Sequence, residues 1–398
     1  MIYKKLKSNN KSILFNRGSK KFMANLLSDV DNKITRHDLN KIEKEFDKND
    51  KEFFQSKNTR KKYSKKPNNY STKNYRKFND AGPRRKKALK KFNKYLNELP
   101  IPKYLYSKTE QGFYKNAKFH WGNTNFVLMD IKSFFPNCTF ESILNFFVKD
   151  GGLKMKPDLA DKLAKLVTRP KSNKTQIREV PQGFPTSPLI CYFAYKPMFD
   201  KISHYARENN LRFSTYVDDL TFSSDKDFNK EKVIDDVIEI LKSYGHNSKK
   251  EKCKKINITS DKIAPTITGI WLKRYKLRAS SKIYNKMMRS YMFLISSKIT
   301  DEKSYFKSLK EFVKLNGIVE TINYIEPQTK PKRQAIINYI KDNKPKFLLS
   351  ISPNNKKFKS SKWKKLIYDA YQFGTLREFY NKLKIADSNC SLTPVDTI

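Results

Sequence analysis

A short segment with two adjacent acids, residues 213–223, constrains the fold of this chain more than any other. It reads FSTYVDDLTFS, and over residues 211–217 apolar or β-branched side chains alternate with polar ones. This alternation is the pattern of a half-buried strand, so the segment predicts a β-hairpin with Asp218 and Asp219 at its tip. An isolated Asp-Asp pair is commonly no more than a good turn. Adjacent carboxylates are also hard oxygen ligands of the kind that suit Mg²⁺.

A third acid supports the metal-binding interpretation. Residues 125–136, NFVLMDIKSFFP, form an apolar run that ends in Asp130. A buried strand with an acid at its carboxyl end places that ligand on a rigid edge, and three carboxylates are typical of a two-metal phosphoryl-transfer site. Because side chains alternate along a strand, Asp218 and Asp219 should point in different directions. We therefore expect Asp130 and Asp218 as the main shared ligands, with Asp219 at longer range.

A loop rich in Gly and Pro lies between these acids. Residues 180–189 read VPQGFPTSPL, and Ser187 followed by Pro188 predicts the N-cap and first position of a helix. Such a loop presents free backbone N–H groups at the helix entrance. Taken alone, the segment would more often be a structural turn than a site, so its value lies in its order and spacing relative to the acids.

The three segments together resemble the palm motifs A, B and C of reverse transcriptases. The matching residues are Asp130 with Phe134-Phe135, then Pro181-Gln182-Gly183, then Tyr216-Val217-Asp218-Asp219. Further segments are similar to bacterial retron enzymes: residues 116–120, NAKFH, resemble their Asn-Ala-x-x-His element, and residues 267–269, ITG, their Val-Thr-Gly element with Ile replacing Val. Residues 315–318 and 324–327 look like the thumb segment shared by retron and group II intron enzymes. The resemblance covers roughly residues 75 to 330.

The resemblance implies an α+β right-hand polymerase. Its parts would be fingers, a palm with an antiparallel sheet backed by helices, and a helical thumb, followed by a helical C-terminal extension. The implied boundaries are a basic N-terminal region at 1–75, fingers at 76–124, palm with inserted fingers elements at 125–270, thumb at 271–330 and the extension at 331–398.

The implied activity is RNA-directed DNA synthesis, and the resemblance assigns site residues to it. Asp130, Asp218 and Asp219, with the main-chain carbonyl of Ile131, would hold two Mg²⁺ ions, for which Mn²⁺ can substitute. Phe135 falls at the family's steric gate, which excludes a 2′-OH. The nucleotide would be lined by Gln182, by Gly183 and, at the place of motif D, by Lys249 or one of its neighbours Lys250 and Lys252.

Charge points to a polyanionic partner. The chain of 398 residues has 84 Lys and Arg against 39 Asp and Glu, a net charge of +45; an AT-rich genome also favours lysine, but the resulting field attracts nucleic acid in either case. Residues 83–99 predict a basic amphipathic helix, in which phosphate contacts or a merely solvated face are equally expected. The candidate RNA-binding residues are Arg84, Arg85, Lys90 and Lys91 on this helix and, by resemblance, Asn116 and His120. The alternative for the last two is a hydrogen-bonded turn that supports the strand to Asp130.

By resemblance, the partners are a structured non-coding RNA that serves as scaffold and template, the product DNA and deoxynucleoside triphosphates, with an effector protein or a second copy as further partners and anti-phage defence as the context. Two alternatives stay open. One is a defence-associated reverse transcriptase outside true retrons, which makes repetitive or poorly templated DNA; the other is an RNA-binding scaffold with an inactive palm, against which the three acids argue.

The remaining expectations concern the cell compartment and the surface. No apolar stretch approaches the roughly eighteen residues of a membrane span, and the first residues form no signal region, so we expect a cytoplasmic protein without a membrane partner. Cys138, Cys191, Cys253 and Cys390 are too widely separated for a zinc knuckle or a disulfide framework. The lysine- and asparagine-rich run at 56–77 predicts a solvated linker or nucleic-acid arm.

Overall fold

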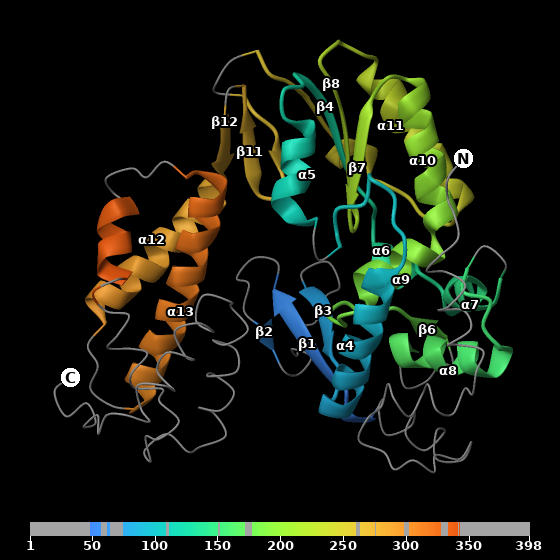
Figure 1. The fold of residues 1–398 in the computed structure, drawn as a ribbon, viewed down its shortest axis with the longest axis horizontal. Coiled ribbons are helices and arrows are strands. Elements are labelled where there is room, and N and C mark those ends of the chain that lie inside the picture. Colours follow the sequence, from blue (N-terminus) through green and yellow to red (C-terminus); the bar gives the residue numbers. More distant parts are fainter. Residues whose placement is uncertain are drawn as a thin grey trace. The chain divides into compact units, whose positions relative to one another are not determined.

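The computed structural model describes residues 48–56, 62–63, 75–108, 111–149, 152–171, 177–259, 263–274, 276–297, 302–327, 333–340 and 342. The chain divides into two compact units, Met1–Ile263 and Ala264–Ile398. Figure 1 shows the helices and strands of both, and each unit is described by itself. The predicted limits of fingers, palm, thumb and terminal regions stay predictions.

A four-stranded antiparallel sheet is the centre of the first unit. Its strand order is β7-β8-β4-β9, with β4 at Asn125–Asp130, β7 at Arg212–Tyr216, β8 at Asp219–Ser224 and β9 at Lys254–Asn257. β7 and β8 form the predicted hairpin, and β4 is the predicted strand that ends in an acid. In the register of β4 with β8, Asp130 lies opposite Asp219.

Helices cover both faces of this sheet. α10 (Lys196–Glu208) packs against β7 and α11 (Lys230–Ser243) against β4, while α5 (Gly112–His120) packs against β7. Figure 1 shows α10 and α11 on one side of the sheet and α5 on the other. The paired Phe213 and Phe222 rings stack with centroids 5.0 Å apart and belong to the same hydrophobic core as buried residues of α10 and α11. The helix α11 begins after its N-cap Asn229, whose side chain accepts a hydrogen bond from the Lys232 amide.

A second sheet lies near the start of the described chain. Its order is β2-β1-β3, with β1 at Lys51–Ser56, β2 at Lys62–Tyr63 and β3 at Tyr75–Asp80. The prediction of an unpacked linker over 56–77 is therefore wrong at Ser56, residues 62–63 and residues 75–77, because backbone pairing with β1 recruits these polar residues into strands. The rest of that run lies outside the described residues.

The basic helix α4 spans Pro83–Glu98, as its periodicity predicts. One of its arginines is buried: Arg85 is 1% exposed. Its guanidinium is 2.8 Å from Asp50 Oδ2 and also donates to the carbonyls of Leu166, at 3.0 Å, and Thr168. It lies over the Phe184 ring, 4.8 Å from the centroid. The prediction that Arg85 contacts phosphate is wrong, because its donors are directed into the protein.

The Gly- and Pro-rich loop is fixed against β3. The Asn79 amide donates to the Gln182 carbonyl at 2.7 Å. Gly183 has φ +117, and a Cβ there would lie 2.4 Å from the Asn79 carbonyl oxygen, so only glycine fits this close approach. The predicted helix follows as α9 (Ser187–Ala194), but its N-cap is Thr186. The N-cap prediction for Ser187 is wrong, since its Oγ instead donates to the Pro181 carbonyl at 2.7 Å.

Short elements complete the first unit. They are α6 at Phe134–Asn137, α7 at Phe140–Val148, α8 at Pro157–Val167, β5 at Arg169–Pro170, β6 at Arg178–Glu179 and the 3-10 helix η1 at Lys250–Lys252.

The second unit begins with a three-stranded antiparallel sheet in the order β10-β11-β12 and continues into helices. Its elements are β10 at Thr266–Ile267, β11 at Ile270–Lys273, β12 at Lys276–Ala279, α12 at Ser281–Ser296 and α13 at Glu302–Ile325. Residues 333–340 are also helical. Glu326 joins these elements, because its carboxylate accepts from the Ala279 amide at 2.8 Å and the Tyr284 hydroxyl at 3.1 Å.

The state of the cysteines and the apolarity of the helices can be checked in the described residues. Cys138, Cys191 and Cys253 are free thiols, and Cys390 lies outside the described residues. Within the part of the chain that the structure describes, none of the helices combines the length and apolarity needed to cross a membrane.

The buried Arg85–Asp50 pair generates a stability prediction. Arg85→Met should lower the free energy of unfolding by about 3–5 kcal/mol, because it leaves the Asp50 carboxylate buried without its partner. Lys94→Met, an exposed change on the same helix, should have an effect within about 0.5 kcal/mol. Urea denaturation of both variants measures the difference, and similar small losses would contradict the role assigned to this pair.

The contact between Gly183 and β3 generates a second prediction. Gly122→Ala introduces a side chain at φ +95 with nothing within 4 Å of its Cβ, so it should cost about 1–2 kcal/mol of backbone strain alone. Gly183→Ala adds the clash with Asn79 and should lower stability further, with faster hydrogen exchange at the Asn79 amide. Equal stability losses in the two variants would show that the close approach is unimportant.

Candidate active site

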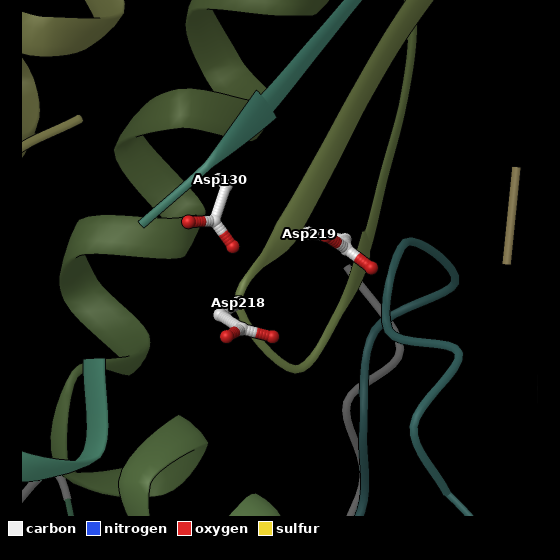
Figure 2. A group of neighbouring side chains, drawn as sticks. All are labelled: Asp130, Asp218 and Asp219. Atoms are coloured by element: carbon white, nitrogen blue, oxygen red, sulfur yellow. The ribbon is translucent and has the colours of Figure 1, made fainter. Parts of the chain in front are cut away.

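Three aspartates gather at the end of the four-stranded sheet. Asp130 ends β4, Asp219 begins β8, and Asp218 lies in the turn before it. Each offers a carboxylate oxygen, and these three oxygens all lie within 4.8 Å of one another. Figure 2 shows the three side chains converging from the strand end and the hairpin. The structure therefore brings together the three acids that the sequence analysis predicted to form the site. The assignment of Asp130 and Asp218 as the main shared ligands stays a prediction.

The electrostatics of the cluster favour a bound cation. The Asp219 side chain keeps access to solvent. Partial desolvation of its carboxyl nevertheless raises its pKa to about 6. The charges of Asp218 and Asp130 raise this pKa further, and Lys254 lowers it. Like charges at this separation repel, and a cation between them relieves the repulsion. Carboxylate oxygens on rigid backbone elements are the donor set that Mg²⁺ prefers, so the residues present fit a divalent metal.

Backbone hydrogen bonds fix the segments that carry these acids. The Ile131 amide, directly after Asp130, donates to the Asp218 carbonyl at 2.9 Å. The next amide, of Lys132, donates to the Asn247 carbonyl at 2.8 Å, and Ile131 also bridges to Ser248. The segment after α11 therefore holds the chain that leaves Asp130. The assignment of the Ile131 carbonyl as a metal ligand stays a prediction.

The turn that carries Asp218 has an unusual backbone. Val217 has φ +63, a conformation that is strained for a β-branched residue. A two-residue hairpin loop demands positive φ at its first position in a type II′ turn, and the pairing of Tyr216 with Asp219 leaves room for only two residues. Hairpin pairing therefore imposes this strain, which no glycine in the sequence signals.

Phe135 lies close to the acids in sequence, on the short helix α6. It is partly buried, and its ring centroid is 5.8 Å from that of Phe134. Phe134 is fully buried, with its ring 5.9 Å from Phe199 and 5.3 Å from His246. The core thus anchors Phe134 and leaves part of Phe135 accessible, an arrangement compatible with the predicted gate.

The other predicted nucleotide contacts are surface positions. Gln182 is half-buried and Gly183 is exposed on the loop fixed by β3, and Lys249 is exposed just before η1. Among the neighbouring lysines, the Lys250 ammonium is engaged by Asp235. The roles of these residues stay predictions.

The predicted RNA-binding residues divide into exposed and buried groups. Arg84, Lys90 and Lys91 lie exposed on α4. Asn116 and His120 are 1% and 0% exposed, so neither side chain faces a partner, and the prediction of RNA contact for this pair is wrong. The alternative interpretation, support for the palm, fits the burial of both.

Sequence reasoning missed the buried polar residues where the hairpin meets the segment around His120. Ser214 and Ser223 are fully buried, and Asn123 is 7% exposed. The alternating pattern marked Ser214 as part of a polar face, which was expected to meet solvent. Local alternation could not signal that α5 covers this face, because the covering contacts join residues far apart in the sequence.

Residues 32–278, more than half of the chain, match the family described as reverse transcriptase (RNA-dependent DNA polymerase). Similar proteins include the retron Se72 reverse transcriptase of Salmonella heidelberg (strain 579083-10), 26% identical over 230 residues that cover 56% of each chain. The retron Ec86 reverse transcriptase of Escherichia coli is 27% identical over 180 residues, 44% of this chain and 51% of that one. The chain thus matches about half the length of these relatives.

A solved structure is also similar. Apo telomerase from Candida tropicalis aligns over 75% of this chain and 60% of its own, with 15% identity and a TM-score of 0.46. The family match spans the strand that ends in Asp130, the glycine loop and the Asp218-Asp219 hairpin in one continuous region. On this ground the chain belongs to the reverse transcriptase family.

Proposed function

We propose that this protein is an RNA-directed DNA polymerase. The observation that carries the proposal is the convergence of Asp130, Asp218 and Asp219 within 4.8 Å at the end of the sheet, in a chain that belongs to the reverse transcriptase family. Such a cluster suits nucleotidyl transfer, in which an oxygen nucleophile attacks a phosphate and negative charge develops on phosphate oxygens.

The aspartates and the Ile131 carbonyl would hold two Mg²⁺ ions, with Mn²⁺ as a substitute; when bound, the ions supply positive charge for activating the primer hydroxyl and stabilising the leaving pyrophosphate. The chain's own contribution is to hold the carboxylates in fixed positions. The β4–β8 pairing sets Asp130 against Asp219, and the bond from the Ile131 amide to Asp218 fixes the turn.

The deoxynucleotide would lie over Phe135 and against the loop at Gln182 and Gly183. Two contacts support this placement: the core-anchored Phe134 restrains its neighbour, and the Asn79 amide holds the loop through the Gln182 carbonyl. Lys249, exposed before η1, would approach the pyrophosphate as it leaves.

The template would be a structured non-coding RNA. The net charge of +45 favours a polyanion, and Arg84, Lys90 and Lys91 are exposed basic residues on α4. The relatives named above are retron reverse transcriptases, and this likeness supports a retron-like partner RNA. Anti-phage defence would be the context that the resemblance to retron enzymes implies.

The proposal predicts loss of activity when either main acid is neutralised. Asp130→Asn and Asp218→Asn should each reduce nucleotide incorporation at least about 100-fold, because a preorganised transition-state contact is removed, while RNA binding and melting temperature change little. Glu239→Gln, an exposed change on α11, serves as the matched control. Primer extension on an RNA template provides the measurement, and near-normal extension by either Asn variant would refute the site.

Sequencing of copurified nucleic acid tests the finer proposal. Wild-type protein should carry one structured RNA together with DNA complementary to it, and the Asp130→Asn variant should carry the RNA alone. Repetitive or untemplated DNA with the wild type would indicate a reverse transcriptase outside true retrons. RNA without DNA in both samples would indicate a scaffold.

A further prediction concerns sugar selection. If the Phe135 ring excludes the 2′-OH, Phe135→Val should raise the ratio of ribonucleotide to deoxynucleotide incorporation about 10-fold or more, since discrimination by shape has this order of magnitude. Phe135→Tyr retains the ring and should keep the selection. Single-nucleotide extension measures the ratio, and an unchanged value in Phe135→Val would place the gate at another residue.

A further inference from the structure

One buried histidine connects α5 to both strands of the acid-bearing hairpin. His120 is 0% exposed. Its Nδ1 lies 2.7 Å from Ser223 Oγ on β8, and its Nε2 lies 2.8 Å from Ser214 Oγ on β7. The Asn123 side-chain amide, three residues along, donates to the same Ser223 Oγ at 2.7 Å. Two neighbouring strands are thus joined through one imidazole ring.

The ring is neutral, which determines how these bonds run. Burial, and secondarily the charge of Arg212, lowers the pKa of His120 to about 3. A neutral imidazole has one donor and one acceptor nitrogen. One ring nitrogen therefore donates to its serine oxygen, and the other accepts from its serine hydroxyl. Because the Ser223 oxygen can accept two hydrogen bonds, the bond from Asn123 is kept in either tautomer, and each of the three contacts has a donor.

The two serines are a diagonal pair of the hairpin. Ser214 lies opposite Thr221, and Ser223 lies two residues further along β8. Diagonal neighbours in antiparallel strands are about 7–8 Å apart, a span that an imidazole with a hydrogen bond on each side can bridge. A diagonal link resists sliding of one strand past the other, which the packing of single side chains does not.

This link lies on the same face of the sheet as the carboxylates. Ser223 and Asp219 are separated by four residues on β8, so they share a face at about 13 Å. Asp130 is opposite Asp219 and shares that face. Further contacts secure α5 itself, because Arg212 at the start of β7 donates to the carbonyls of Phe119 and Trp121 at 3.0 and 3.2 Å.

We propose that His120 is a positioning residue for nucleotidyl transfer: by joining Ser214 to Ser223 it fixes the register and spacing of the strands that present Asp218 and Asp219. The inference deepens the proposed function and rests on it. An ordinary core histidine would stabilise the fold without affecting the geometry of the acids, and this difference can be measured.

Three changes at His120 separate its two hydrogen bonds. His120→Leu removes both, His120→Asn retains an amide near the Nδ1 position toward Ser223, and His120→Gln retains one near the Nε2 position toward Ser214. His204→Leu, an exposed histidine on α10, is the matched control. The single hydroxyl deletions Ser214→Ala and Ser223→Ala carry the test even if His120→Leu fails to fold.

In primer extension well below the melting temperature, His120→Leu should lower kcat about 10- to 100-fold, the usual cost of misplacing a catalytic group by about 1 Å. The KM for deoxynucleotide should stay within about threefold, and half-maximal activity should require several-fold more Mg²⁺. His120→Asn and His120→Gln should recover part of kcat. Ser214→Ala should reduce kcat when it is made in the wild type. The same change should reduce kcat by a smaller factor when it is made in His120→Asn, because that variant has already lost the bond to Ser214.

Hydrogen exchange separates failure of this inference from failure of the proposed function. Amides of residues 212–223 should exchange faster in His120→Leu than in the wild type, and added Mg²⁺ should protect them less. This measurement needs no polymerase activity, so a wild type without synthesis would refute the function and leave the link testable. A variant with reduced melting temperature but unchanged kcat, Mg²⁺ requirement and hairpin exchange would overturn the positioning role.

Discussion

The antiparallel pairing of β4 with β8 is the constraint on which the site depends. It sets Asp130 directly opposite Asp219 and leaves the two-residue turn to carry Asp218. Because side chains alternate along a strand, a slip of one residue would move Asp219 to the opposite face. The apolar face, where Phe213 and Phe222 stack in the core that α10 and α11 also line, makes such a slip costly, since it would expose these rings and bury charge. The hydrophobic core thus specifies where the acids lie.

Buried polar groups connect this sheet and its neighbours at points where apolar packing alone would allow sliding. Arg85 joins Asp50, the end of α8 and Phe184, and His120 joins α5 to both hairpin strands. A buried ion pair is weak support for stability in itself, since desolvation offsets much of its attraction. Its directional bonds nevertheless admit few alternative arrangements, and in both cases one of the groups held in place belongs to a segment that carries predicted site residues: Phe184 to the loop of Gln182 and Gly183, and the two serines to the hairpin of Asp218 and Asp219.

Local patterns predicted the elements and the acids because the information is local. Alternation identified the hairpin of Asp218 and Asp219, and an apolar run identified the strand to Asp130. The burial of Arg85 and His120 could not be predicted because their partners are distant in sequence: Leu166 lies 81 residues from Arg85, and Ser223 lies 103 residues from His120. The positive charge of a helix residue indicates a preference for water, but it does not reveal that Asp50 and the carbonyls of Lys165, Leu166 and Thr168 accept from this guanidinium inside the protein. The strain at Val217 was likewise invisible, since strand pairing imposes it.

The strongly positive chain and its anionic centre act over different distances. With a net charge of +45, the protein attracts a polyanion, yet exposed charges more than about 8 Å apart are largely screened at physiological ionic strength. The three carboxylate oxygens lie within 4.8 Å of one another, so their mutual repulsion persists where the long-range attraction does not. General charge therefore governs how nucleic acid is gathered, and the local cluster governs what cation is held. Attraction of nucleic acid and binding of a cation can therefore vary independently. The number of surface lysines can change while the geometry of the acids at the end of β4 stays fixed.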